Sequence, residues 1–111
     1  MSQVFALEQQ LENAKQLVAR RDLALKLSKN PDFRKLIMEQ FCVTECAKYA
    51  QLSADFDMSV EARESALAMA QAAGHLRRFM EICITQGNVH ERDIVNIEVA
   101  IDTARAEEDN V

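Results

Sequence analysis

Apolar residues recur at intervals of three and four along the first 29 residues, which predicts an apolar stripe on one side of an α-helix. The stripe consists of Val4, Leu7, Leu11, Ala14, Val18 and Leu25, and Arg21 occupies the one core position that is not apolar. This spacing is the heptad register of a coiled coil. Leu17, Ala24 and Leu27 widen the stripe, so we expect the helix to contact two neighbours.

Two partners for this N-terminal helix fit the pattern. The helix either pairs with other copies of the chain, with Val4, Leu7, Leu11, Ala14, Val18, Arg21 and Leu25 as the oligomer interface, or forms the first arm of an intramolecular bundle. We take the oligomerisation helix, residues 1–29, as the working hypothesis. Arg21 would then set the register of the paired helices or bind an acidic residue across the interface.

A second helix is predicted to begin at Asn30-Pro31-Asp32, because Asn caps free helix amides, Pro suits the first turn and Asp complements the helix dipole. Apolar residues cover most of the circumference of this helix up to Leu52, which predicts a central element packed on several sides. Residues 53–59 form a loop rich in capping residues, whose Phe56 and Met58 are expected to fold back onto the core.

A third helix is predicted to start after the N-cap Ser59 and to run through Gly74, with a kink there as the alternative, to Gln86. Its small residues Ala66, Ala70 and Ala73 favour a close helix neighbour. Gly87-Asn88 then predicts a helix end followed by a new N-terminus, because glycine suits the left-handed C-terminal position and Asn88 with Glu91 matches a capping box.

The fourth helix carries a stripe of Ile94, Ile97, Ile101 and Ala104. Residues 94–101 also alternate in a way that suits a β-strand, but the good helix formers that follow favour a helix. The sequence thus predicts an all-α, four-helix bundle-like single domain over residues 1–111. It has a long N-terminal amphipathic helix, a helical core over residues 30–107 and a frayed tail at 108–111.

Composition narrows the possible partners. The 111 residues contain 18 acidic and 13 basic ones, and the net charge of −5 opposes nucleic acid as the main ligand. No apolar run approaches the length of a membrane span, and three cysteines cannot pair completely within one chain. We therefore expect a cytoplasmic protein that does not bind membranes.

The residues with catalytic or ligand-binding chemistry do not form a recognisable motif. Cys42 and Cys46 face the same way on a helix, but Cys83, His75 and His90 are the only further candidates for a metal site. Buried thiols and surface histidines explain these residues better. We expect no catalytic residues, no metal and no cofactor, and hence no enzyme.

Two stretches carry a resemblance to known sequences: Asn30-Pro31-Asp32-Phe33-Arg34-Lys35-Leu36-Ile37, leading into Tyr49-Ala50-Gln51-Leu52-Ser53-Ala54-Asp55, and Ala73-Gly74-His75-Leu76-Arg77-Arg78-Phe79, continuing to Glu91-Arg92. Residues 28–95 resemble short, largely uncharacterised helical proteins encoded by tailed bacteriophages. The resemblance implies a phage origin and a virion or assembly role, and it transfers no functional residues.

The sequence hypothesis is therefore a non-enzymatic phage protein that acts through protein contacts. It would self-associate through its N-terminal helix and join other virion or host proteins, in the cytoplasm of the infected cell and in the virion. The alternative is a small phage-encoded binding module that inhibits or redirects a host protein, using its acidic surface to meet a basic partner.

Overall fold

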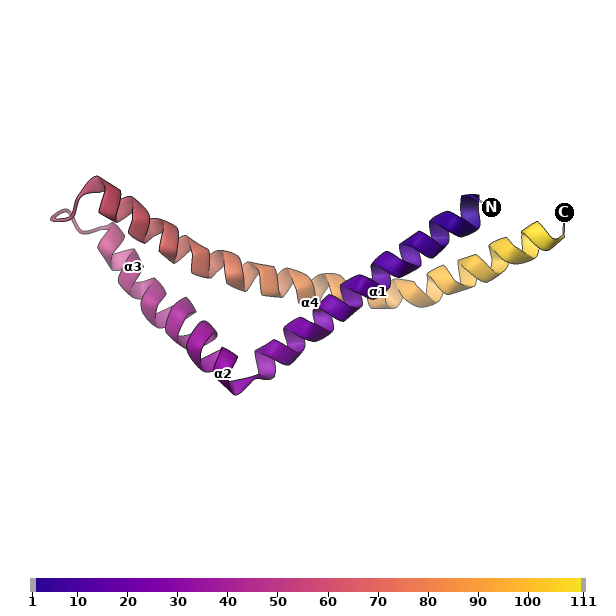
Figure 1. Ribbon diagram of the computed structural model, residues 1–111, viewed down its shortest axis with the longest axis horizontal. Coiled ribbons are helices and arrows are strands. Elements are labelled where there is room, and N and C mark those ends of the chain that lie inside the picture. Colours follow the sequence, from indigo (N-terminus) through magenta and orange to yellow (C-terminus); the bar gives the residue numbers. More distant parts are fainter. Residues whose placement is uncertain (1, 111) are drawn as a thin grey trace. The chain divides into compact units, whose positions relative to one another are not determined.

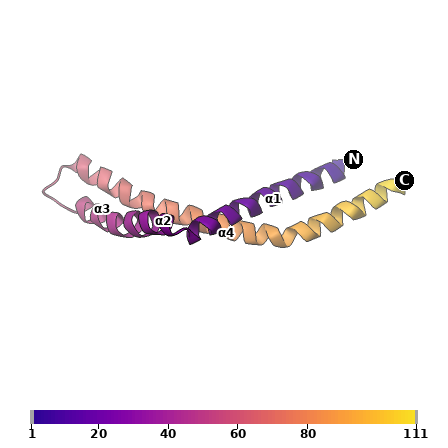
Figure 2. The ribbon, with the colours of Figure 1, turned by 60° about the horizontal axis from the view of Figure 1, so that its bottom comes forward.

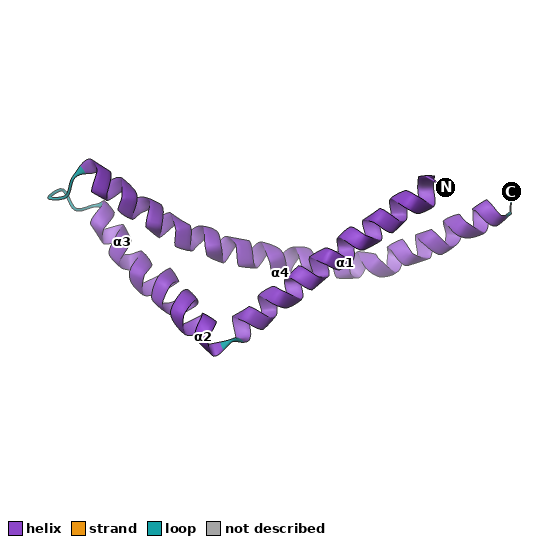
Figure 3. Ribbon diagram, viewed as in Figure 1, coloured by secondary structure: helices purple, strands orange, loops and turns teal. Residues whose placement is uncertain are grey.

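The computed structural model describes residues 2–110, which are helical apart from short connections (Figures 1 and 3). Within this range no residue forms a β-strand, so the all-α prediction is confirmed and residues 94–101 are helical. The chain divides into two compact units. Unit 1 joins the residues up to Leu25 with those from Ile82 onward, and unit 2 is Lys26–Glu81.

Unit 1 is an antiparallel pair of helices. Helix α1 (Ser2–Lys29) provides one arm, and the C-terminal part of α4 (Val60–Asp109) provides the other. Glu8 near the start of α1 contacts Arg105 near the end of α4, whereas Arg21 contacts Glu91. The two arms therefore run in opposite directions side by side (Figure 2).

The predicted helix boundary at Gly87-Asn88 is wrong, because α4 continues through both residues as one helix of 50 residues. Helix α4 also passes through Gly74 unbroken, as predicted, and extends to Asp109 into the segment predicted to fray. The described residues thus form two helical hairpins, and the structure does not show the predicted four-helix bundle. The residues that suggested a helix end, Gly87, Asn88 and Glu91, serve tertiary contacts instead.

Unit 2 is also a hairpin. A continuous helical run, α2 (Pro31–Phe33), η1 (Arg34–Glu45) and α3 (Cys46–Ser53), packs against the N-terminal part of α4. The predicted caps are confirmed. The Oδ1 of Asn30 accepts hydrogen bonds from the amides of Asp32 and Phe33 at 2.9 and 3.0 Å, and the Oγ of Ser59 accepts one from the amide of Ala62 at 3.1 Å.

Small residues hold the two arms of unit 2 close together, as their spacing predicted. Ala66 and Ala73 are buried and Ala70 is half-buried. The thiol of Cys46 lies 3.6 Å from the carbonyl oxygen of Ala70, and that of Cys42 lies 3.9 Å from the carbonyl oxygen of Ala73. A side chain larger than alanine on this stripe would separate the arms.

The η1 segment is a π-helix, whose backbone hydrogen bonds join residues five apart. Its Phe41 is half-buried and its Cys42 is buried. The thiol of Cys42 points to the α4 backbone at Ala73, so this side of η1 faces α4.

Two expectations about unit 2 are wrong. The segment 31–53 is not packed on several sides, because Cys42 is its only buried residue and Leu36 and Val43 are exposed. Phe56 does not fold back onto the core. It is 89% exposed, and its ring lies 5.6 Å from the guanidinium carbon of Arg63, while Met58 is half-buried. A hairpin offers each helix one neighbour, so the remaining apolar side chains face outward.

Candidate interaction site

The structure places the predicted α1 stripe against the chain's own α4. Ala14 and Arg21 are buried, and the other five members of the stripe are half-buried. The facing residues of α4 recur at intervals of four and three, and all are buried or half-buried: Cys83, Gly87, His90, Ile94, Ile97, Ile101 and Ala104. Unit 1 is therefore an antiparallel coiled coil within one chain, and we call its interface the α1–α4 seam.

Arg21 is the one charged residue buried in this seam. Its Nη1 donates hydrogen bonds to Oε2 of Glu91 at 2.7 Å and to Oδ1 of Asn88 at 3.0 Å, and its Nη2 donates to Oε1 of Glu91 at 3.2 Å. Its Nε and Nη2 also donate to Oδ1 of Asp22 at 3.1 and 3.0 Å. Two carboxylates and one amide thus satisfy the guanidinium, in the planar geometry that suits arginine.

Gly87 makes room for the Arg21 side chain. A Cβ added at Gly87 would overlap the Cβ of Arg21 and lie 2.8 and 2.9 Å from its Cγ and Cδ. The aliphatic stem of Arg21 therefore crosses directly over the α4 backbone at a residue that has no side chain. The sequence pattern at Gly87, Asn88 and Glu91 also fits a helix boundary, so the sequence alone does not reveal this role.

The positive charge of Arg21 and the negative charges of Glu91 and Asp22 stabilise one another. The hydrogen bonds to Arg21 hold the pKa of the Glu91 carboxyl below its ordinary value. The pKa of Arg21 is raised, chiefly by its hydrogen bonds to Glu91 and then to Asp22. Glu91 is more than half exposed, whereas the Arg21 side chain is only 10% exposed. The arginine is thus the buried member of the pair, and its partners connect it to the surface.

Further polar contacts flank the seam. The Nη2 of Arg105 donates to Oε1 of Glu8 at 2.6 Å, and the Nη2 of Arg20 donates to Oε1 of Gln86 at 2.5 Å. On the α1 helix, Glu8 and Asp22 lie on one side of the seam, and Leu17 and Arg20 lie on the other. Ion pairs therefore line the side of the seam that carries Glu8 and Asp22. We call the other side, which carries Leu17 and Arg20, the Leu17 flank.

The Leu17 flank carries a shallow groove of about 510 Å³, lined by Asn13, Gln16, Leu17, Arg20 and His90. Nδ1 of His90 lies 2.8 Å from the carbonyl oxygen of Gln86, one helical turn earlier. His90 is half-buried, in line with the partly exposed position expected for it, and His75 is exposed. The groove combines one leucine with hydrogen-bonding groups.

No family model, curated protein or solved structure matches the chain.

The remaining candidates for chemistry are dispersed. Cys42 and Cys83 are buried, Cys46 is half-buried, and all three thiols are free. Burial raises the pKa of the Cys42 thiol, which keeps it protonated and poorly nucleophilic. Among residues 2–110, no three His, Cys, Asp or Glu side chains converge in a way that could hold a metal ion.

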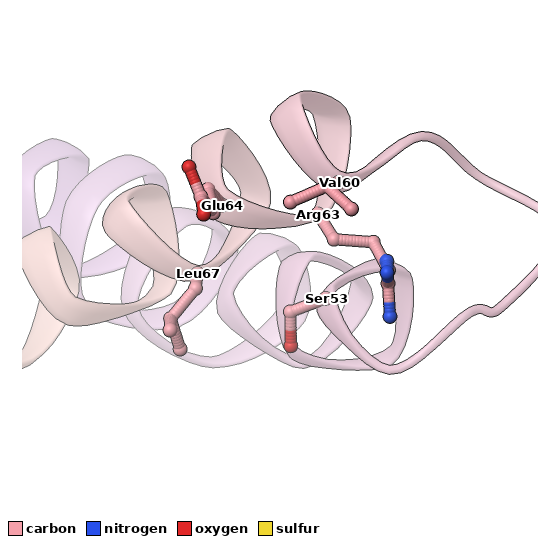
Figure 4. Close-up of a pocket in the computed structure, with 5 residues that line it drawn as sticks. All are labelled: Ser53, Val60, Arg63, Glu64 and Leu67. Carbon is pink, nitrogen blue, oxygen red and sulfur yellow. The ribbon is translucent and has the colours of Figure 1, made fainter.

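Unit 2 has a small pocket of about 240 Å³ beside the loop before α4, lined by Ser53, Val60, Arg63, Glu64 and Leu67 (Figure 4). One hydroxyl, one cation and one carboxylate lie among apolar side chains there. The pocket holds neither a histidine nor a cysteine, so it lacks the usual bases and nucleophiles. Across the described part of the chain, none of the helices has both the length and the apolar character needed to cross a membrane.

Proposed function

We propose that this protein is a non-enzymatic, self-associating helical protein, in which unit 1 hairpins from two copies pair into an intermolecular four-helix bundle. The observation that supports this proposal is the incomplete burial of the α1 stripe. Val4, Leu7, Leu11 and Leu17 are only half-buried in unit 1.

These half-buried side chains suit a dimer, because a second hairpin would cover them as the second neighbour of α1. A second copy is the occupant that supplies a matching surface without any further partner.

The Leu17 flank is the proposed contact surface. Seam residues Val4, Leu7 and Leu11 keep part of their surface exposed, and Leu17 widens the stripe toward the groove. Helices of four-helix bundles carry an apolar face wider than a two-stranded seam, because each one contacts two neighbours. The opposite flank holds the ion pairs of Glu8 and Arg21, which are already satisfied within the chain.

The test is the mass of the purified protein in solution, measured by light scattering over a range of concentrations. The wild type is expected at twice the mass of one chain, and Leu17→Glu at the mass of one chain. Leu23→Glu is the matched control, because Leu23 is 63% exposed and lies on the face of α1 opposite the seam. A wild type with the mass of one chain would refute the proposal, as would an equal effect of both variants.

The biological setting rests on the resemblance of residues 28–95 to short phage proteins. It supports a role as a virion or assembly component, made in the cytoplasm of the infected host and joined there by other virion proteins. Peptide mass spectrometry of purified particles tests this role. Peptides of the protein at a constant ratio to the major capsid protein are expected, and their absence contradicts a virion component.

The net charge of −5 favours one alternative, a binding module that inhibits or redirects a basic host protein. A tagged chain would then recover one host protein from a lysate at low salt and lose it at high salt, because salt screens exposed charges. A self-associating assembly protein would instead recover its own untagged copies under both conditions.

A further inference from the structure

Arg21 occupies a core position that a coiled-coil seam normally fills with an apolar residue. We propose that Arg21 commits the α1 stripe to α4 of the same chain and prevents it from pairing with α1 of a second copy. This role goes beyond the proposed dimer, which uses the Leu17 flank and leaves the α1–α4 seam intact.

The first step is the fit of Arg21 to one register of α4. Its stem needs a residue without a side chain, which Gly87 provides, and its guanidinium needs the acceptors Asn88 and Glu91. Sliding α4 by one heptad would place Met80 or Ile94 where Gly87 lies. Both side chains would collide with the arginine stem, so only the observed register accommodates Arg21 in the seam.

The second step is the absence of such a fit on another α1. In a parallel pair of α1 helices each core residue faces its own copy, so Arg21 would face the second Arg21. Asp22 would accompany each arginine, but the bonds to Asn88 and Glu91 would be lost. In an antiparallel pair with Leu11 opposite Ala14 of the second copy, Arg21 would face Val4 instead. Both arrangements bury a guanidinium with fewer partners than α4 provides.

The other residues of the α1 stripe do not discriminate between α4 of the same chain and α1 of a second copy. Val4, Leu7, Leu11, Ala14, Val18 and Leu25 would fill the core of an α1–α1 coiled coil as well as that of the α1–α4 seam. A single buried polar residue in such a seam is known to select register and partner. Arg21 is the one member of the stripe that can make this selection.

The experiment compares wild type, Arg21→Leu and Arg92→Leu in the full chain; Arg92 is exposed in unit 1 and lies on the face of α4 opposite the seam. Equal amounts of ¹⁵N-labelled and unlabelled protein are mixed, unfolded in urea, refolded together and treated with a lysine cross-linker. Lys15 is exposed on the ion-pair flank, away from the proposed dimer surface, so it reports α1–α1 pairing in the seam. The readout is the yield of Lys15–Lys15 peptides that join a labelled to an unlabelled chain.

We expect at least a tenfold higher yield of these mixed peptides for Arg21→Leu than for wild type, with a mass by light scattering above that of wild type. Arg92→Leu, which makes the same change at an exposed arginine outside the seam and the groove, should match wild type. A yield for Arg21→Leu equal to that of wild type would overturn the proposal, and so would the same rise in Arg92→Leu.

Two further measurements keep the result interpretable. The double variant Arg21→Glu with Glu91→Arg exchanges the two charges, so positions 21 and 91 still attract each other within one chain. Two α1 helices would then bring like charges together at position 21, so the yield of mixed cross-links should equal that of wild type. Circular dichroism must show that Arg21→Leu is folded, and unfolding of this variant would also contradict the proposal, because leucine suits both seams. The solution mass of the wild type tests the proposed dimer, whereas the cross-link yield of Arg21→Leu tests the role of Arg21. Either proposal can therefore be refuted without the other.

Discussion

Replacing each of the two glycines of α4 by alanine should change stability in opposite directions. Both residues lie inside the same long helix, where alanine is favoured over glycine by about 1 kcal/mol. An added Cβ at Gly74 meets nothing within 4 Å. Gly74→Ala should therefore stabilise the protein by about 0.5 to 1 kcal/mol.

At Gly87 the same methyl group has no space. It would overlap the Cβ of Arg21, an atom fixed by the α1 backbone, so the two helices must separate to admit it. Overpacking of this kind costs about 1 to 3 kcal/mol. Separation would also weaken the hydrogen bonds of Arg21 to Asn88 and Glu91. After the gain in helix propensity is subtracted, Gly87→Ala should destabilise the protein by about 1 to 2 kcal/mol.

Urea unfolding followed by circular dichroism at 222 nm measures both effects. A difference of about 2 to 3 kcal/mol between the variants corresponds to about 1 M or more in the urea midpoint, for slopes typical of small proteins. Gly74→Ala is the matched control, because it makes the same chemical change in the same helix. If Gly87→Ala were as stable as Gly74→Ala, the close approach of Arg21 to the α4 backbone would be refuted.

Three more predictions concern a core residue, a cap and a titrating group. Ile101→Ala, at a site 5% exposed, should cost about 2 to 5 kcal/mol in urea unfolding, whereas Val99→Ala, at a site 60% exposed, should cost less than about 1 kcal/mol. Asn30→Ala removes the acceptor of two helix amides and should cost about 1 kcal/mol, and Asn30→Gly should cost only a few tenths; equal stability of Asn30→Ala and wild type would contradict the cap. Because the pKa of Glu91 is lowered in the folded chain, its contribution to stability is present above the ordinary glutamate pKa and is lost as the pH falls through the lower, folded value. Thermal melts between pH 7 and pH 2 should therefore show a smaller acid-induced decrease for Glu91→Gln than for wild type, and an identical decrease would contradict this role.

The sequence by itself determined the helical segments and most of their buried stripes. The heptad on α1 and the stripe of Ile94, Ile97 and Ile101 are both found facing an interface, and the caps at Asn30 and Ser59 lie where the sequence placed them. These features are local, because helix periodicity and capping depend on residues a few positions apart.

The tertiary structure decided which stripe meets which, because pairing depends on contacts between residues far apart in the chain. Glycine followed by an Asn-x-x-Glu pattern suits a helix end, and it also suits an arginine that crosses the helix at the glycine. Only the tertiary position of Arg21 shows that Gly87, Asn88 and Glu91 have the second role. Local patterns therefore define the faces of these helices, and packing between distant segments selects their partners.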